Sequence, residues 1–105
     1  MKQFEGGTCR IANEVVDLLI ASAAARVDGV EEVYGLDPQT NRLRRGYDRF
    51  LSTSTEEGVL ETSLTIRIAL GESICDVIEQ VQVAVRREVT SMLGLECRDV
   101  SVFVV

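Results

Sequence analysis

The sequence of 105 residues lacks histidine and tryptophan and has only five aromatic residues. Histidine is the commonest general base and metal ligand in proteins, so its absence removes the usual centre of acid–base and metal chemistry. Because aromatic side chains are so few, the hydrophobic core is predicted to be built from Val, Ile, Leu and Ala. An apolar content of 46 % is enough for such a core in one domain of this length.

The motifs of nucleophilic and phosphate-binding enzymes are also missing. No serine stands in a nucleophile elbow, and no glycine-rich loop carries a lysine to hold phosphates. The pairs Glu31-Glu32 and Glu56-Glu57 consist of adjacent residues, which point to different sides of an extended chain, so neither pair forms a shared-proton dyad. Cys75 lies beside Asp76, whose negative charge opposes a thiolate. We therefore expect a protein that is not an enzyme, with no catalytic, cofactor-binding or metal-binding residues.

Long apolar runs are absent as well. No stretch approaches the roughly 20 apolar residues that span a bilayer, and the N-terminus lacks the apolar segment of a signal peptide. We therefore expect a cytoplasmic protein that does not insert directly into a membrane. The net charge of −6 argues against a nucleic-acid partner, because such binding depends on neutralising phosphates. The three cysteines, at positions 9, 75 and 97, have no metal-ligand or redox spacing, so we expect reduced and mostly buried thiols.

Hydrophobic periodicity predicts an α+β domain with the element order β-α-β-β-α-β. The expected elements are strand 8–11, helix 13–27, strand 30–34, strand 58–70, helix 74–93 and strand 100–105. One-faced strands and helices with apolar stripes favour a two-layer sandwich, in which the two main helices cover one face of a small sheet. The chain 1–105 is expected to be a single domain with a variable, Arg-rich insert at 36–57 between the second and third strands.

Three of these elements have informative faces. In strand 58–70 every second residue from Leu60 to Leu70 is apolar or Thr, which indicates one face on the core and one toward water. Helix 74–93 carries a stripe of Ile74, Val77, Ile78, Val81, Val85, Val89 and Met92. Helix 13–27 is apolar most of the way round, which is typical of a helix that is buried on more than one side. We interpret its second side as a subunit contact and expect a homo-oligomer.

The insert at 36–57 is the least regular part of the sequence. Asn41 is expected to begin a short helix, because Leu43, Tyr47, Phe50 and Leu51 follow helical spacing. The segment 52–57 is predicted to be an exposed, mobile linker. Four arginines crowd the insert: Arg42, Arg44, Arg45 and Arg49. They are either a solvated helix face or a docking patch for an acidic partner, with Tyr47 and Phe50 either holding the insert down or joining the contact.

Two stretches together resemble a known family. The first contains Gly7, Ile11-Ala12, Glu14-Val15-Val16, Ala23-Ala24, Val27 and Gly29-Val30, and the second contains Leu93-Gly94-Leu95 and Val100, Val102 and Val104. In order and spacing these features are similar to those of the alkaline-shock-protein family of bacterial envelope stress proteins. The resemblance covers roughly three-quarters of the chain. The insert and its arginines match no family motif.

The resemblance implies a non-enzymatic protein of the envelope stress response that acts as a protein-binding or scaffold module. Some family members are held beneath the membrane by a membrane-spanning partner, so a membrane-anchoring protein is an expected partner here. Other members are linked to fatty-acid precursor metabolism. The alternative interpretation is therefore a small-molecule-sensing regulatory domain.

Overall fold

The structure, a computed structural model, describes residues 13–105. Its elements are α1 (Asn13–Ala25), β1 (Val30–Val33), β2 (Leu36–Asp37), β3 (Arg42–Leu43), the 3-10 helix η2 (Tyr47–Arg49), β4 (Leu51–Glu56), β5 (Val59–Ile68), α2 (Ile74–Leu93) and β6 (Glu96–Val104). The strand expected at 8–11 lies outside the described residues. The other five are present, with ends that differ by a few residues. Leu70, expected on the core face of strand 58–70, lies beyond the end of β5 and is exposed.

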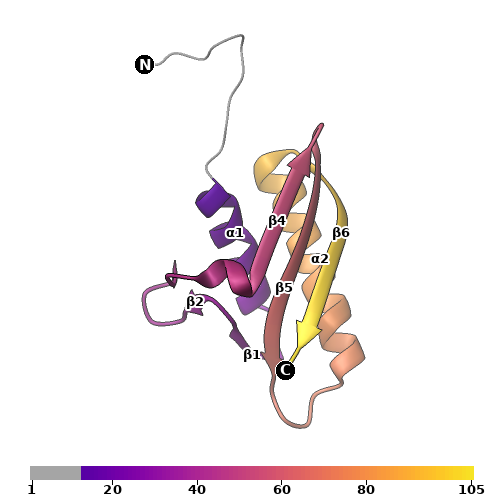
Figure 1. Cartoon of the computed structure of the whole chain (residues 1–105). Helices are drawn as coiled ribbons and strands as arrows, with labels where there is room; N and C mark the ends of the chain where they lie inside the picture. Colours follow the sequence, from indigo (N-terminus) through magenta and orange to yellow (C-terminus); the bar gives the residue numbers. More distant parts are fainter. Residues whose placement is uncertain (1–12) are drawn as a thin grey trace.

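The long strand β5 is the centre of the main sheet (Figure 1). Strand β6 runs parallel to it on one side, from Val59↔Glu96 to Ile66↔Val104. Two short strands share its other side and are both antiparallel to it. Strand β4 pairs with the first half of β5, and β1 pairs with its last residues. The edge of β5 opposite β6 is therefore made of two half-strands placed end to end.

Both helices cover the same face of this sheet, behind it in Figure 1. Of the stripe predicted to be the buried side of α2, Val77, Val81, Val85 and Val89 are buried and Ile78 is half-buried. Ile74 and Met92, at its two ends, are exposed, so the prediction was wrong there. The four buried valines pack with buried residues of the main sheet, of α1 and of β2, which are Val16, Ile20, Ala21, Ala23, Ala24, Val33, Leu36, Leu51, Leu60, Leu64, Ile66 and Val100. No aromatic residue belongs to this buried set within residues 13–105. The α+β class, the two-layer arrangement and the aliphatic core are thus confirmed.

The short helix expected from Asn41 is wrong. This segment instead forms the two-residue strands β2 and β3, paired as Leu36↔Leu43 and Asp37↔Arg42, followed by a single 3-10 turn. Gly46 has φ +81, in the left-handed region, and so interrupts any right-handed helix across positions 41–51. The apolar residues of the segment have helical spacing but do not form one buried helical face. Leu51 is in the core, Leu43 and Tyr47 pack against its edge, and Phe50 is exposed.

The mobile linker expected at 52–57 is also wrong. Residues Leu51–Glu56 form β4, which pairs with β5 along its whole length. A hydrogen bond of 3.0 Å joins the hydroxyls of Thr53 and Thr62 across these strands. The polar sequence forms a strand because the backbone groups on one of its edges pair with β5. The expectation of mostly buried thiols fails at Cys75, which is exposed, whereas Cys97 is half-buried and both are free.

Candidate partner-binding surface

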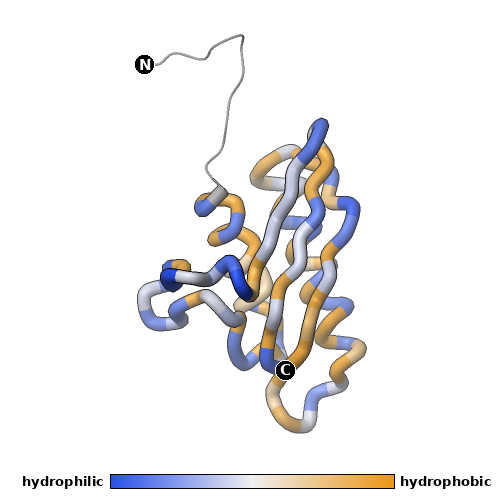
Figure 2. Tube along the Cα trace, in the orientation of Figure 1, coloured by the Kyte–Doolittle hydropathy of each residue, from blue (hydrophilic) through white to orange (hydrophobic). Residues whose placement is uncertain are grey.

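Residues 36–50, here called the arm, leave the sheet between its two half-strands. The amide of Tyr34 donates to the carbonyl of Thr65, and the amide of Thr65 donates to the carbonyl of Phe50, both at 3.0 Å. The residues at the two ends of the arm, Tyr34 just before it and Phe50 at its end, are therefore both hydrogen-bonded to Thr65 of β5. The arm projects to the left of the sheet in Figure 1. Figure 2 shows much of its course as hydrophilic.

One hydrogen bond anchors the arm to the helical layer. The hydroxyl of Tyr47 donates to Oδ2 of Asp17 on α1 at 2.6 Å. Asp17 is 7 % exposed, and its other carboxylate oxygen has no partner within the described residues. This bond, together with burial and the charge of Asp17, raises the pKa of Tyr47 to about 12. The phenol therefore stays protonated and remains a donor across the physiological range.

Close packing adds to this anchor. Gly35 has φ +92, and a Cβ at this position would lie 2.9 Å from the Cβ of Tyr47. The carbonyl of Gly35 accepts from the amide of Arg44 at 2.7 Å. A hydrogen bond of 3.3 Å from the hydroxyl of Ser22 to Asn41 connects the tip of the arm to α1. The arm is therefore held at both its middle and its tip.

The four arginines of the insert lie on this anchored arm and are all exposed. Other arginines of the chain form ion pairs: Arg26 with Glu88, Arg67 with Glu31 and Glu32, and Arg98 with Glu61. Within residues 13–105 none of the four arm arginines has such a partner. The arm has four arginines and two aspartates, so it is net positive in a chain of net charge −6.

The six predicted partner-binding residues do not form one patch. Arg42, Arg44, Arg45 and Arg49 all lie on the arm, in β3, in the turn after it and in η2. Tyr47 points inward and holds the arm down, which is one of the two roles left open for it. Phe50 lies at the end of the arm with its ring centroid 5.5 Å from that of Tyr34. Tyr34 was not predicted, because the two rings come from segments separated by the whole arm.

A shallow groove of about 320 Å³ lies where the arm meets α1. It is lined by Glu14, Val15, Leu18, Arg42 and Leu43. Val15 is 56 % exposed, although it belongs to the apolar arc of the helix. The excess apolar surface predicted for this helix is thus present, and it borders one of the arm arginines.

Features of other classes of site are missing from the part of the chain that the structure describes. No group of three or more Cys, Asp or Glu side chains is placed to hold a metal ion among residues 13–105. Nor does any helix in this range have the length and apolar character needed to cross a membrane.

Comparison with known proteins identifies both the fold and the family. The nickel form of a substituted MamM CTD has a TM-score of 0.62 and 19 % identity to this chain, covering 88 % of it and 95 % of the MamM chain. The cadmium form of another MamM CTD variant has a TM-score of 0.61 and 18 % identity, covering 90 % of this chain and 96 % of its own. At such low identity the likeness concerns the fold alone.

No curated protein matches the sequence. The profile of the alkaline-shock-protein family, which is described as having a cell envelope-related function, matches residues 1–105. This match agrees with the motifs in the first helix and the last strand. The chain therefore belongs to the alkaline-shock-protein family.

Proposed function

We propose that this chain is a non-catalytic protein-binding module of the cell envelope, in which the arm arginines hold an acidic segment of a partner protein. The observation that carries the proposal is the set of four exposed arginines without ion pairs among residues 13–105. Guanidinium groups bind carboxylates with two parallel hydrogen bonds and lose less hydration than lysine does. A cluster of such groups on an anchored segment favours a specific acidic partner.

The anchoring of the arm supports the same function. A surface that is ordered before binding avoids part of the conformational entropy that a loose loop would lose on association. The bond from Tyr47 to Asp17 and the close contact at Gly35 order the arm in this way. The family's envelope-related function supports a partner at the envelope, and a membrane-spanning protein that holds this chain beneath the membrane would meet these requirements.

The test is an affinity pull-down from the native host, with membrane and soluble fractions treated separately. Wild type is compared with the double variant Arg44→Glu/Arg45→Glu. The matched control is Arg86→Glu/Arg87→Glu, which makes the same charge change at two exposed neighbours on α2. We expect a protein that wild type and the α2 control recover and the arm variant loses, while urea unfolding of the arm variant stays unchanged. Recovery of the same proteins by all three chains would refute the role of the arm.

Self-association through α1 is the second part of the proposal. The groove beside Val15, Leu18 and Leu43 would be covered by another copy of the chain, which accounts for the exposed apolar arc of the helix. Val15→Asp is expected to lower the molecular mass measured in solution at high concentration. A wild-type chain that remains a strict monomer at high concentration would rule this out.

A small-molecule-sensing domain is the second candidate function. The observation that favours it is an apolar groove of about 400 Å³ beside α2, lined by Val27, Glu79, Gln80, Val83, Ala84 and Arg87. An acyl chain on the apolar floor with an acidic group at Arg87 would suit this surface. A thermal-shift screen with acyl-CoA precursors is expected to raise the unfolding midpoint in that case, because a ligand that binds the folded state stabilises it. An unchanged midpoint for every compound would exclude this candidate.

A further inference from the structure

We propose that the open face of the sheet, opposite the helices, is a second binding surface and that it takes a basic, amphipathic segment of a partner protein. This surface is distinct from the arm arginines. The arginines are proposed to bind an acidic segment, whereas the open face is proposed to bind a basic one. The two parts of this face are a group of exposed or half-buried aromatic residues and a band of carboxylates further along the sheet.

None of the aromatic side chains within residues 13–105 belongs to the buried core. Of the four within residues 13–105, Tyr34, Phe50 and Phe103 lie on the open face, and Tyr47 holds the arm. Phe103 is 58 % exposed and Phe50 is 37 % exposed. Aromatic side chains usually contribute their large apolar area to cores or to interfaces. Since the core here is aliphatic, their gathering on the exposed face indicates an interface.

The strand register brings these three residues into one row across the sheet. Phe103 of β6 pairs with Thr65 of β5, and Thr65 is hydrogen-bonded on its other side to both Tyr34 and Phe50. We call Tyr34, Phe50 and Phe103 the aromatic row. The next row toward the start of β5 consists of Ser52, Ser63 and Ser101, which are register partners across the three strands.

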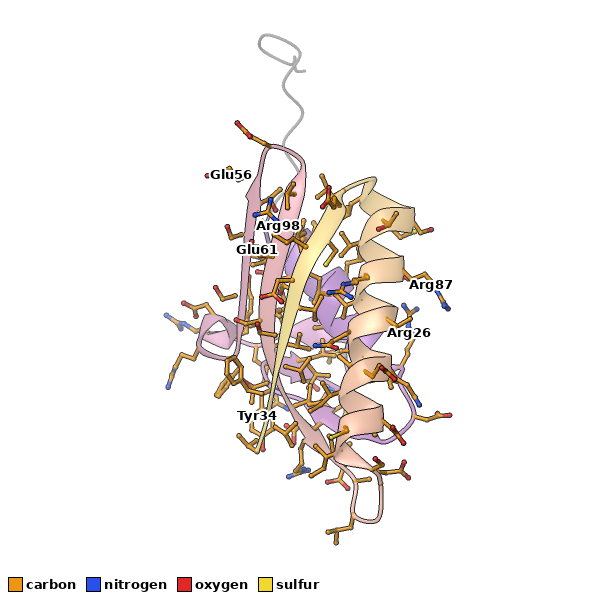
Figure 3. All side chains as sticks on the ribbon, turned by 90° about the vertical axis from the view of Figure 1, so that its right-hand side faces the viewer. Arg26, Tyr34, Glu56, Glu61, Arg87 and Arg98 are labelled. Carbon is orange, nitrogen blue, oxygen red and sulfur yellow. The ribbon has the colours of Figure 1, made fainter. Side chains whose placement is uncertain are left out.

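Beyond the serines the face becomes acidic. The register partners there include Glu61 with Asp99 and Val59 with both Glu56 and Glu96. We call Glu56, Glu61, Glu96 and Asp99 the acidic band. One cation lies among them, Arg98, which pairs with Glu61 at 3.4 Å. Four carboxylates against one guanidinium leave the band net negative. Figure 3 shows Glu56, Glu61 and Arg98 at the end of the sheet away from Tyr34.

This order of rows defines the chemistry of the ligand. Thr65 and Glu61 are four residues apart in β5, so the aromatic row and the acidic band are separated by about 13 Å. A helix covers that distance in about nine residues. A segment with apolar side chains at one end and Lys or Arg about two and a half turns away would therefore contact both.

The negative charge of the acidic band favours a basic peptide segment over an anionic lipid surface, a nucleic acid or an acidic peptide. An anionic lipid surface or a nucleic acid would be repelled by the acidic band. An acidic peptide would leave the face for the arm arginines. A short basic segment combines the two attractions that the face offers, and the serine row between them presents hydroxyls to either kind of backbone group.

The experiment is a phage-display selection. A library of random peptides of about 20 residues is selected for binding to the immobilised full chain. Parallel selections use Phe103→Ala, the double variant Glu61→Gln/Asp99→Asn and the matched control Asp76→Asn/Glu79→Gln, which neutralises two exposed carboxylates on α2. Enriched peptides are then synthesised, and their affinities for each chain are measured by fluorescence anisotropy at two salt concentrations. The Arg44→Glu/Arg45→Glu variant is included to separate this surface from the arm.

We expect enriched peptides to carry apolar residues at one end and Lys or Arg at the other. Their affinity should fall at least about tenfold with Phe103→Ala, because exposed aromatic anchors dominate such interfaces. The acidic-band variant should lose most of the salt dependence, while the α2 control and the arm variant bind as wild type does.

Three outcomes would overturn the inference. These are enrichment of acidic peptides, equal enrichment on wild type and Phe103→Ala, and no enrichment above background. Sedimentation of the same chains provides a further check. A dimer of wild type that Phe103→Ala dissociates would show that a second copy, rather than a basic segment, covers this face.

Discussion

The hydroxyl of Tyr47 lies 2.6 Å from a carboxylate oxygen of Asp17, thirty residues earlier in the chain. This contact links the arm to the first helix. It also provides the sole hydrogen-bond partner of that buried carboxylate within residues 13–105. One anchor of the arm and the hydrogen bonding of the Asp17 side chain within residues 13–105 therefore depend on the same tyrosine.

Tyr47→Phe removes the phenol hydroxyl and leaves the buried carboxylate of Asp17 without a hydrogen-bond donor within residues 13–105. Hydrogen bonds to charged groups stabilise a fold by about 1.5–3 kcal/mol. Because Tyr47 is half-buried, we expect the loss in the free energy of unfolding to lie at the lower end of this range, about 1.5 kcal/mol. Urea denaturation measures it, with Tyr34→Phe as the control, expected to stay within about 0.5 kcal/mol of wild type. Equal effects of the two changes would contradict the role of the bond.

The same residue predicts a dependence on pH. Hydrogen bonding to Asp17 raises the pKa of Tyr47 from 10.0 to about 12. In the unfolded chain the phenol loses its proton near its ordinary pKa, so the stabilisation is complete below pH 10 and is lost as the pH rises toward 12. We expect the stability difference between wild type and Tyr47→Phe to shrink over this interval. A difference that is constant from neutral pH upward would disprove the shift.

Two glycines with nearly identical φ angles test the packing of the arm. Gly35 and Gly71 have φ of +92 and +90, but a Cβ at Gly35 would meet Tyr47 at 2.9 Å, whereas a Cβ at Gly71 has nothing within 4 Å. Alanine at either position carries the backbone strain, and only Gly35→Ala adds the overlap. We expect Gly35→Ala to lower the unfolding free energy by about 1–3 kcal/mol more than Gly71→Ala does. Thermal or urea unfolding of the pair decides it, and equal losses would mean that the arm yields freely.

The two described cysteines are predicted to differ in reactivity. Burial, and to a lesser degree the charge of Asp99, raises the pKa of the Cys97 thiol, although Arg86 opposes the shift. Cys75 is exposed on the first turn of α2. Because the thiolate is the reactive form, iodoacetamide is expected to modify Cys75 before Cys97. Peptide mapping by mass spectrometry follows both sites in one reaction, and faster modification of Cys97 would contradict this assignment.

Sequence reasoning succeeded where one periodic face meets one core. Strand β5 alternates between core and solvent over ten residues, and α2 repeats valine at helical spacing, so each reveals its buried side without knowledge of its neighbours. Strand β4 gave no such signal. Its polar residues become a strand through backbone pairing with β5, and a single residue at its start, Leu51, reaches the core.

The arm and the open face show a second limit. Leu43, Tyr47, Phe50 and Leu51 have helical spacing, yet they contact α1, Asp17, Tyr34 and the core respectively. The aromatic row is assembled from three separate segments, and only the strand register brings them together. The sequence has few aromatic residues, from which an aliphatic core was predicted. That prediction was the one indication that the aromatic side chains lie outside the core.

The arm's return to Thr65 has a consequence for how such a domain can diversify. Since both ends of the excursion meet the same residue of β5, the number of residues between them does not enter the register of the sheet. Lengthening a flexible connection costs little, about 0.6 kcal/mol for each doubling. Insertions between positions 34 and 51 can therefore leave β1, β4 and β5 in place, as long as Leu36 stays in the core and Tyr47 keeps its bond to Asp17. The segment between positions 34 and 51 can thus vary while the sheet and the helices stay the same. A new binding specificity can be acquired in this segment without a change of fold.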